Sequence, residues 1–182
     1  MADAPKNSWG LVRMDRTAKM HQKLGGFDLK HKSVVPLPTY MVKKNERILG
    51  LNSYQRLHYW LLNQCKKDYR EKLGDWHMAL PKFKTLKIKY TIYFKTKRKK
   101  DLDNYTAPLH KFMCDYLVEN GVIPEDDYTI VTGFSSEFGG IDDNYAIVEL
   151  KGEEELTQDK AFNAIVEGMK ILKWGEDESK QE

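Results

Sequence analysis

The amino-acid sequence predicts an α/β (α+β) domain in which a small mixed β-sheet is flanked by helices. The first observation is that apolar residues alternate with more polar ones over positions 86–95, the period of a strand with one buried face. The second is a stripe of apolar residues at helical spacing over positions 109–117, which predicts an amphipathic helix after that strand. The third is the composition of the 182 residues. Of these, 41% are hydrophobic and 12% aromatic, which suffices for a core against which helices and sheet can pack.

The first predicted elements precede the long strand. A short apolar run at 32–35 predicts a strand, which Pro36 and Pro38 stop or confine to an edge of the sheet. One helix follows, with Asn52 or Ser53 as its N-cap and Gly74 as its end. The residues that recur at helical spacing in it are Leu57, Trp60, Leu61, Gln64 and Cys65.

The remaining elements follow the long strand. The helix at 109–117 ends at Gly121. Two further strands are predicted at 128–135 and 145–151, joined by a loop that carries Gly139 and Gly140. A third amphipathic helix is expected at 156–173.

These elements suggest three parts of the chain. Residues 1–30 are expected to form a basic, loosely ordered N-terminal arm. The alternative is an arm with a function, whose basic residues contact a phosphate backbone. Residues 31–152 form the folded domain. Residues 153–182 form the C-terminal amphipathic helix and an acidic tail.

Charge is distributed unevenly although the net charge is only +3. Residues 82–100 contain nine Lys or Arg and no acid, which predicts a positive face. The two cysteines lie in apolar segments, as buried thiols in a reducing compartment do. Because no window approaches about 18 consecutive apolar residues, we expect no membrane span and a cytoplasmic location.

Two carboxylates, Asp101 and Asp103, follow the basic run directly. If the chain stays extended there, both point to the same side and could share Mg²⁺ or Mn²⁺. A third carboxylate could come from the turn at 125–127, since the end of one strand and the start of another can meet at a site. Simpler interpretations remain open. Asp101 and Asp103 could be loop residues or N-caps of the next helix, and residues 125–127 a polar turn. The basic run could be a solvated strand edge, and Lys111 could pair with Asp115 at i,i+4.

The combined pattern resembles the RusA family of Holliday junction resolvases, found in bacteria and their phages. The resemblance covers the basic run, D-L-D-N at 101–104, a helix with K and D-x-L, a glycine, and D-D before a strand, from about 86 to 151. It implies a RusA-like fold, a divalent metal held by Asp101, Asp103 and Asp127, and a catalytic lysine at Lys111. Asn104 matches the family's asparagine, and Asp126 or Glu125 would be outer ligands.

The spacing departs from the family at one point. The family lysine usually comes three residues after the asparagine, whereas Lys111 comes seven after Asn104. An ungapped alignment would place Ala107 at the lysine position and leave the chain without that lysine. A four-residue insertion instead keeps Lys111 and the later motif residues in register. If those residues add one helical turn, the Lys111 side chain stays on the same face of the helix and shifts by about 5 Å along the axis.

The resemblance implies a Mg²⁺-dependent endodeoxyribonuclease, with Mn²⁺ as an alternative ion, that resolves four-way DNA junctions as a homodimer in a bacterial or phage-infected cell. The cations expected to bind the DNA backbone are Lys95, Lys97, Arg98, Lys99 and Lys100. Three alternatives stay open: a nuclease for other branched DNA, a non-catalytic nucleic-acid-binding module, and a protein whose basic face meets an acidic partner.

Overall fold

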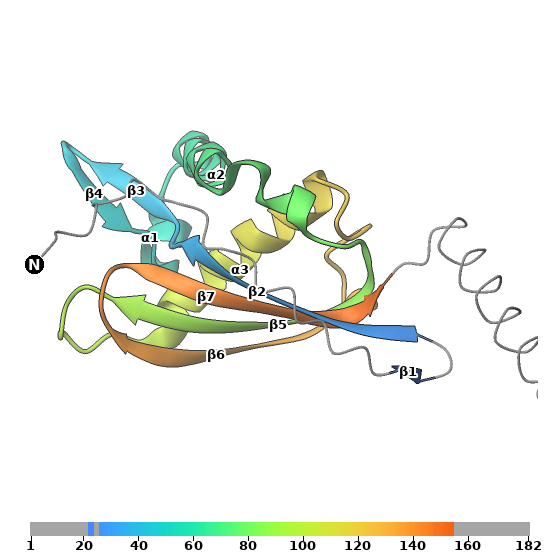
Figure 1. Cartoon of the computed structure of the whole chain (residues 1–182). Coiled ribbons are helices and arrows are strands. Elements are labelled where there is room, and N and C mark those ends of the chain that lie inside the picture. The colour runs from blue at the N-terminus through green and yellow to red at the C-terminus, as the bar shows by residue number, and fades with distance from the viewer. Residues whose placement is uncertain (1–21, 24–25, 155–182) are drawn as a thin grey trace, which may run out of the picture.

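The computed structural model describes residues 22–23 and 26–154 of the chain, which form a sheet with helices on it (Figure 1). The strands are β1 (Gln22–Lys23), β2 (Gly26–Pro36), β3 (Thr39–Val42), β4 (Asn45–Ile48), β5 (Phe83–Phe94), β6 (Val131–Ile141) and β7 (Tyr145–Glu154). The helices are α1 (Leu51–Arg56), α2 (Tyr59–Leu73), a 3-10 helix η1 (Gly74–Ala79) and α3 (Leu102–Glu119).

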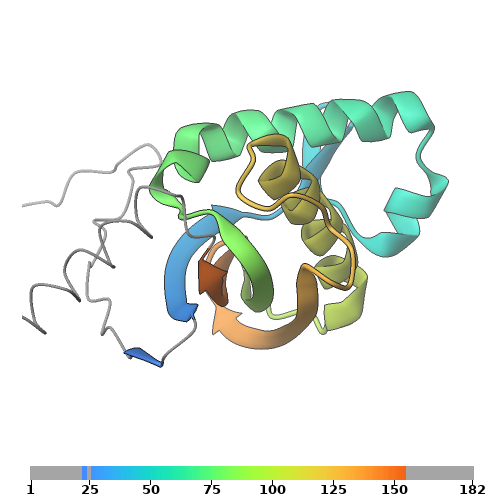
Figure 2. The ribbon, with the colours of Figure 1, turned by 90° about the vertical axis from the view of Figure 1, so that its right-hand side faces the viewer.

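The main sheet has five strands in the order β1-β2-β7-β5-β6, and β3 pairs with β4 in a separate hairpin. Within the main sheet only β5 and β6 run parallel, and α3 forms the crossover between them. Figure 2 shows α3 lying on the sheet and α2 packed beside it on the same side. The predicted fold class, a small mixed sheet with packed helices, is therefore confirmed.

The long strand predicted at 86–95 is confirmed as β5, which starts three residues earlier. Its alternate residues Leu86, Ile88, Tyr90 and Ile92 are buried beneath the helices, because each second side chain of a strand points to the same face. The stripe predicted for α3 meets them and is also buried: Leu109, Phe112, Met113, Tyr116 and Leu117.

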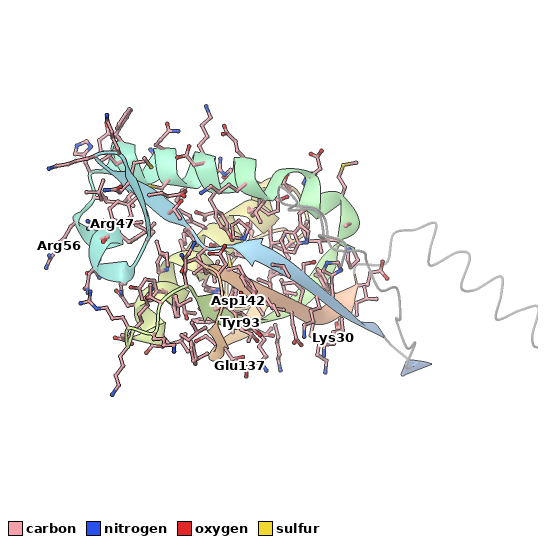
Figure 3. The ribbon with its side chains drawn as sticks, turned by 60° about the vertical axis from the view of Figure 1, so that its left-hand side comes forward. Lys30, Arg47, Arg56, Tyr93, Glu137 and Asp142 are labelled. Carbon is pink, nitrogen blue, oxygen red and sulfur yellow. The ribbon has the colours of Figure 1, made fainter. Side chains whose placement is uncertain are left out.

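The opposite face of the sheet carries charged side chains that pair across strands. Glu149 of β7 lies 3.1 Å from the Lys30 ammonium and 3.2 Å from that of Lys32, while Lys89 lies 2.9 Å from Glu137. Figure 3 shows Lys30, Tyr93 and Glu137 on the side of the sheet away from α2. Such exposed pairs add little stability each, but they keep this face polar.

The single helix predicted to end at Gly74 is in fact two helices, α1 and α2. Leu57 and His58 are extended, with ψ of 138° and 142°, and they break the helix. The His58 ring caps α2 by accepting the backbone N–H of Trp60 at 3.4 Å. The N-cap prediction of Asn52 or Ser53 is wrong because α1 starts after Gly50, whereas the predicted end at Gly74 is confirmed at φ 52°.

The strand predicted at 128–135 is β6, which begins later and continues through both glycines that we expected in a loop. The Tyr93 side chain of β5 accounts for glycine within this strand, because its ring packs directly on the backbone of Gly139. A Cβ on Gly139 would lie 2.5 Å from the ring. Gly140 adopts φ 144° where the pairing register shifts between Ile92 and Tyr93. Tertiary packing therefore selects these glycines, which the sequence pattern had suggested as turn residues.

Several predictions fall outside the described residues. They are the helix at 156–173, the acidic tail and most of the arm at 1–30. The boundary predicted at 152 lies inside β7, which continues to Glu154. Within the described residues, no helix is long and apolar enough to cross a membrane.

Candidate nucleic-acid interface

Asp101 and Asp103 lie at the start of α3. Asp101 occupies the N-cap position with φ −75° and ψ 118°, without a side-chain capping hydrogen bond, and Asp103 lies in the first helical turn. The chain is therefore helical from Leu102 onward. The extended segment that we assumed for this stretch ends at Asp101, so its condition for two carboxylates on one side is not met, and the N-cap alternative describes the position of Asp101.

Asn104 ties this start of α3 to the start of α1. Its side-chain oxygen accepts the backbone N–H of Asn52 at 3.2 Å. A Cβ on Gly50 would lie 2.6 Å from the Asn104 amide nitrogen, so glycine at this position leaves room for the amide to approach the backbone. The asparagine of the D-L-D-N motif thus holds two helices together in this chain.

Asp127 organises the turn that leads into β6. One of its carboxylate oxygens accepts the hydroxyl of Thr129 at 2.5 Å, the backbone N–H of Thr129 at 2.7 Å and that of Ile130 at 3.2 Å. The hydrogen bond from the Thr129 hydroxyl, followed by that from its N–H, lowers the pKa of Asp127. The polar-turn interpretation is therefore confirmed for this residue.

The two parts of the proposed metal site lie at opposite ends of the sheet strands. Beside Asp101, the Lys100 ammonium lies 4.2 Å from the centroid of the Phe94 ring at the end of β5. The carbonyl of Asp127 accepts the N–H of Val131, which pairs with Leu86 near the start of β5. Eight residues of strand separate these levels, about 26 Å. The expectation that they meet fails because β5 and β6 are parallel, so α3 carries the chain from the end of β5 back to the opposite end of the strands, where β6 begins.

Oxygen ligands such as these carboxylates suit Mg²⁺ chemically, but their placement does not gather them. Within the described part of the chain, no group of three or more His, Cys, Asp or Glu is arranged to hold a metal ion. The carboxylates that the resemblance assigns to the metal therefore do not form one centre as they are placed here.

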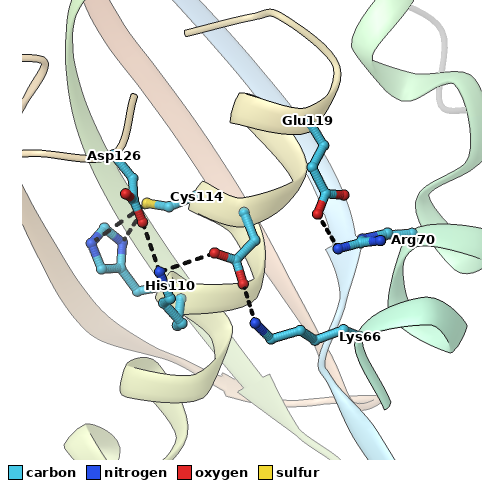
Figure 4. Close-up of polar contacts among 8 residues, drawn as sticks. Lys66, Arg70, His110, Cys114, Glu119 and Asp126 are labelled. Carbon is cyan, nitrogen blue, oxygen red and sulfur yellow. Dashed lines mark hydrogen bonds and ion pairs between the residues drawn. The ribbon is translucent and has the colours of Figure 1, made fainter. Parts of the chain in front are cut away.

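Lys111 lies in the middle of α3 and takes part in a network of ion pairs. Figure 4 shows two other members of this network, Lys66 and Asp126, with the ion pairs as dashed lines. Its ammonium lies 2.8 Å from Asp126 and 3.0 Å from Asp115, and Asp115 also lies 2.6 Å from the ammonium of Lys66 on α2. The hydrogen bond to Asp126, then that to Asp115, raises the pKa of Lys111, so its charge is fixed at neutral pH. The i,i+4 pair that was an open alternative is confirmed.

Asn104 and Lys111 lie on the same helix. α3 runs without interruption from Leu102 to Glu119, so all positions between these two residues are helical. Lys111 lies eight residues beyond Asp103, which is about 12 Å along the axis. Lys111 consequently contacts Asp126 of the later D-D pair and stands well apart from Asp103.

A pair formed by the partly buried His110 and the buried Cys114, beside this network, was missed by sequence reasoning. His110 lies 3.0 Å from the Tyr90 hydroxyl, its ring stacks on Phe134 at 4.0 Å, and it lies 3.7 Å from the sulfur of Cys114. Burial lowers the pKa of His110 and raises that of Cys114 to about 12. Both are therefore neutral at pH 7 and fill the space between α3 and the sheet. Their i,i+4 spacing was the available signal.

The predicted DNA-binding cations form one exposed loop between β5 and α3, here called the cationic loop: Lys95, Lys97, Arg98, Lys99 and Lys100. Lys100 alone folds inward onto the Phe94 ring, and burial, with the nearby Arg98 charge second, lowers its pKa. The backbone N–H of Lys95 donates to the Asn144 side chain at 3.0 Å, which anchors the loop to the β6–β7 turn. The other cations project into solvent.

A second basic group lies at the same end of the fold and was not predicted. Arg47 in the β3–β4 hairpin and Arg56 at the end of α1 are exposed, and Figure 3 shows both on the end of the molecule that carries these elements. In Figure 1 the hairpin, α1 and the loop after β5 share that end. Asp101 and Asp103 thus lie at an end of the fold that carries two sets of cations.

Comparison with known proteins adds no family: no protein-family model matches the chain, and no curated protein matches it significantly.

Proposed function

We propose that this protein is an endodeoxyribonuclease that resolves four-way DNA junctions by paired nicks, the RusA-type activity implied by its motif. One observation carries the proposal. The cationic loop leads directly into D-L-D-N, so exposed cations and two carboxylates share one end of the fold. A surface that neutralises phosphates beside acidic groups is what a phosphodiester-cleaving enzyme needs.

Different residues of the chain have different roles in this proposal. Lys97, Arg98 and Lys99 hold phosphate oxygens, the arginine through its planar pair of donors. Lys111 is a fixed positive charge whose partners position it on α3. A Mg²⁺ or Mn²⁺ ion is the cofactor that the resemblance implies. Because the carboxylates are not gathered, we assign it no ligand set. A homodimer would offer two equivalent sites to a junction with two-fold symmetry.

Replacing Lys97, Arg98 and Lys99 together by glutamine tests the binding surface. Each phosphate contact contributes about 0.9 to the slope of log K against log salt, so the slope should fall by about 2 to 3. The measurement is fluorescence anisotropy with labelled junction DNA over a salt series. The control replaces Lys82, Lys84 and Lys87, exposed cations at the other end of β5, and should leave the slope nearly unchanged. Equal effects of the two triple variants would indicate only a general charge effect.

The Asp103→Asn variant tests cleavage. The natural protein should nick a synthetic four-way junction symmetrically in Mg²⁺ or Mn²⁺ and leave a matched linear duplex intact. Because the proposal counts Asp103 among the catalytic groups, the variant should cleave at least about 100-fold more slowly while it binds the junction equally well. Asp75→Asn, at an exposed carboxylate in η1, is the matched control and should retain full activity.

A non-catalytic nucleic-acid-binding module is the second candidate. It is favoured because the described residues contain no group of three or more His, Cys, Asp or Glu that could hold a metal ion. It predicts junction binding without nicking in either ion, with Asp103→Asn indistinguishable from the natural protein. Cleavage of flaps or forks in preference to four-way junctions would instead indicate a nuclease for other branched DNA.

A further inference from the structure

We propose that the groove between the cationic loop and the end of β6 binds one unstacked nucleobase of the DNA, with the neighbouring phosphates held on the groove's basic rim. The inference rests on the proposed function, because DNA supplies the base. It also deepens that function by adding a contact that only DNA with unstacked bases can make.

The floor of the groove is apolar and partly exposed. Phe138 and Ile141 of β6 are 57% and 46% exposed, although large apolar side chains are usually buried in a fold of this size. Beneath them the buried Phe94 ring lies near that of Phe138, with centroids 6.4 Å apart and planes tilted by 19°. The exposed Phe138 ring therefore offers a flat, supported surface, the kind on which nucleobases stack.

The rim of the groove is positively charged. Lys97, Arg98, Lys99 and Lys100 line it, and Lys100 is turned over the Phe94 ring. The acidic side chain that follows Ile141 is directed elsewhere, because the Asp142 carboxylate accepts the Tyr145 hydroxyl at 2.9 Å. An apolar floor with a cationic rim is complementary to a nucleotide, which has an aromatic face and an anionic phosphate.

The size of the groove agrees with this occupant. Its volume is about 580 Å³, within the range of sites that hold small molecules and cofactors. Bases in a continuous duplex are stacked on each other and cannot enter it. Branch points and single-stranded segments present bases with a free face, so the groove would favour those substrates.

The test compares the full chain with a labelled oligothymidylate and with the same oligonucleotide made abasic throughout. Anisotropy titrations should give at least about fivefold tighter binding to the base-containing strand, the lower end of the effect of one stacked base. Phe138→Ala should abolish this preference and leave the affinity for the abasic strand unchanged. Phe138→Trp, which restores a stacking ring, should keep the preference.

Phe134→Ala is the matched control, because it removes the same side chain from the same strand at nearly the same exposure, 55%, outside the groove. It should keep the base preference, and thermal unfolding should show both alanine variants folded. A natural protein that binds both strands equally, or a Phe138→Ala variant that keeps the preference, would overturn the proposal. Base preference without junction cleavage would instead refute the nuclease while leaving the groove assignment standing.

Discussion

Replacing Gly152 with alanine is expected to destabilise the fold by about 3 kcal/mol or more, because the added carbon has no space. A Cβ at this position would lie 1.9 Å from the carbonyl oxygen of Thr85, which is backbone and cannot rotate away. Gly152 lies in β7 between β2 and β5, opposite Leu29 and Leu86. Relief of the collision would have to separate two central strands.

Chemical denaturation followed by circular dichroism measures this effect. Gly133→Ala is the control, because a Cβ there has no atom within 4 Å, and its free energy of unfolding should change by no more than about 0.5 kcal/mol. If the two variants proved equally stable, the close approach of β7 and β5 at Gly152 would be wrong.

Replacing Asp115 with alanine is expected to cost about 2 kcal/mol at pH 7, because the carboxylate joins two helices. Asp115 lies between Lys66 of α2 and Lys111 of α3, and only 17% of its side chain is exposed. Its removal leaves both ammonium groups without this partner. The exposed pair of Arg70 with Glu119 links the same region, and Glu119→Gln should cost at most about 1 kcal/mol.

The contribution of Asp115 to the free energy of unfolding should decrease at low pH. Burial raises the pKa of Asp115, but the hydrogen bonds from Lys66 and Lys111 outweigh it, so the folded-state pKa lies below its ordinary value of 3.8. The carboxylate of Asp115 is therefore protonated more readily in the unfolded chain than in the folded one. Its contribution to stability is complete above the ordinary pKa of 3.8 and is lost as the pH falls through the lower, folded-state pKa. The difference in unfolding free energy between natural protein and Asp115→Asn should shrink on acidification from pH 5 downward. A difference that grew on acidification would contradict this assignment.

Some of the site could be predicted from sequence and some could not. The cationic loop was predicted because five cations within six residues cannot be buried. The groove beside it was missed, since its floor combines Phe94 with Phe138, and these are brought together by the parallel pairing of β5 and β6. The sequence could not show whether Asp101, Asp103 and Asp127 come together, because this depends on which end of the strands each segment reaches.

The helices show the same division. The stripe of α3 was predicted because side chains three and four apart share a face of any helix. The break between α1 and α2 was not, because Leu57 and His58 carry no strong helix-breaking signal and the pattern continues through them. At the start of α1, Gly50 is fixed by contact with Asn104, a residue 54 positions away.

The sequence by itself determined the fold class, the long strand β5, the buried face of α3 and the positive charge between them. Each of these follows from residues close together in the chain, whose periodicity and charge act locally. Only the tertiary structure decided that β6 runs through Gly139 and Gly140, that Lys111 binds Asp126, and that the start of α3 lies far from the turn at Asp127. These depend on strand order and crossover direction, which arise from packing between distant segments and leave no periodic signal in the sequence.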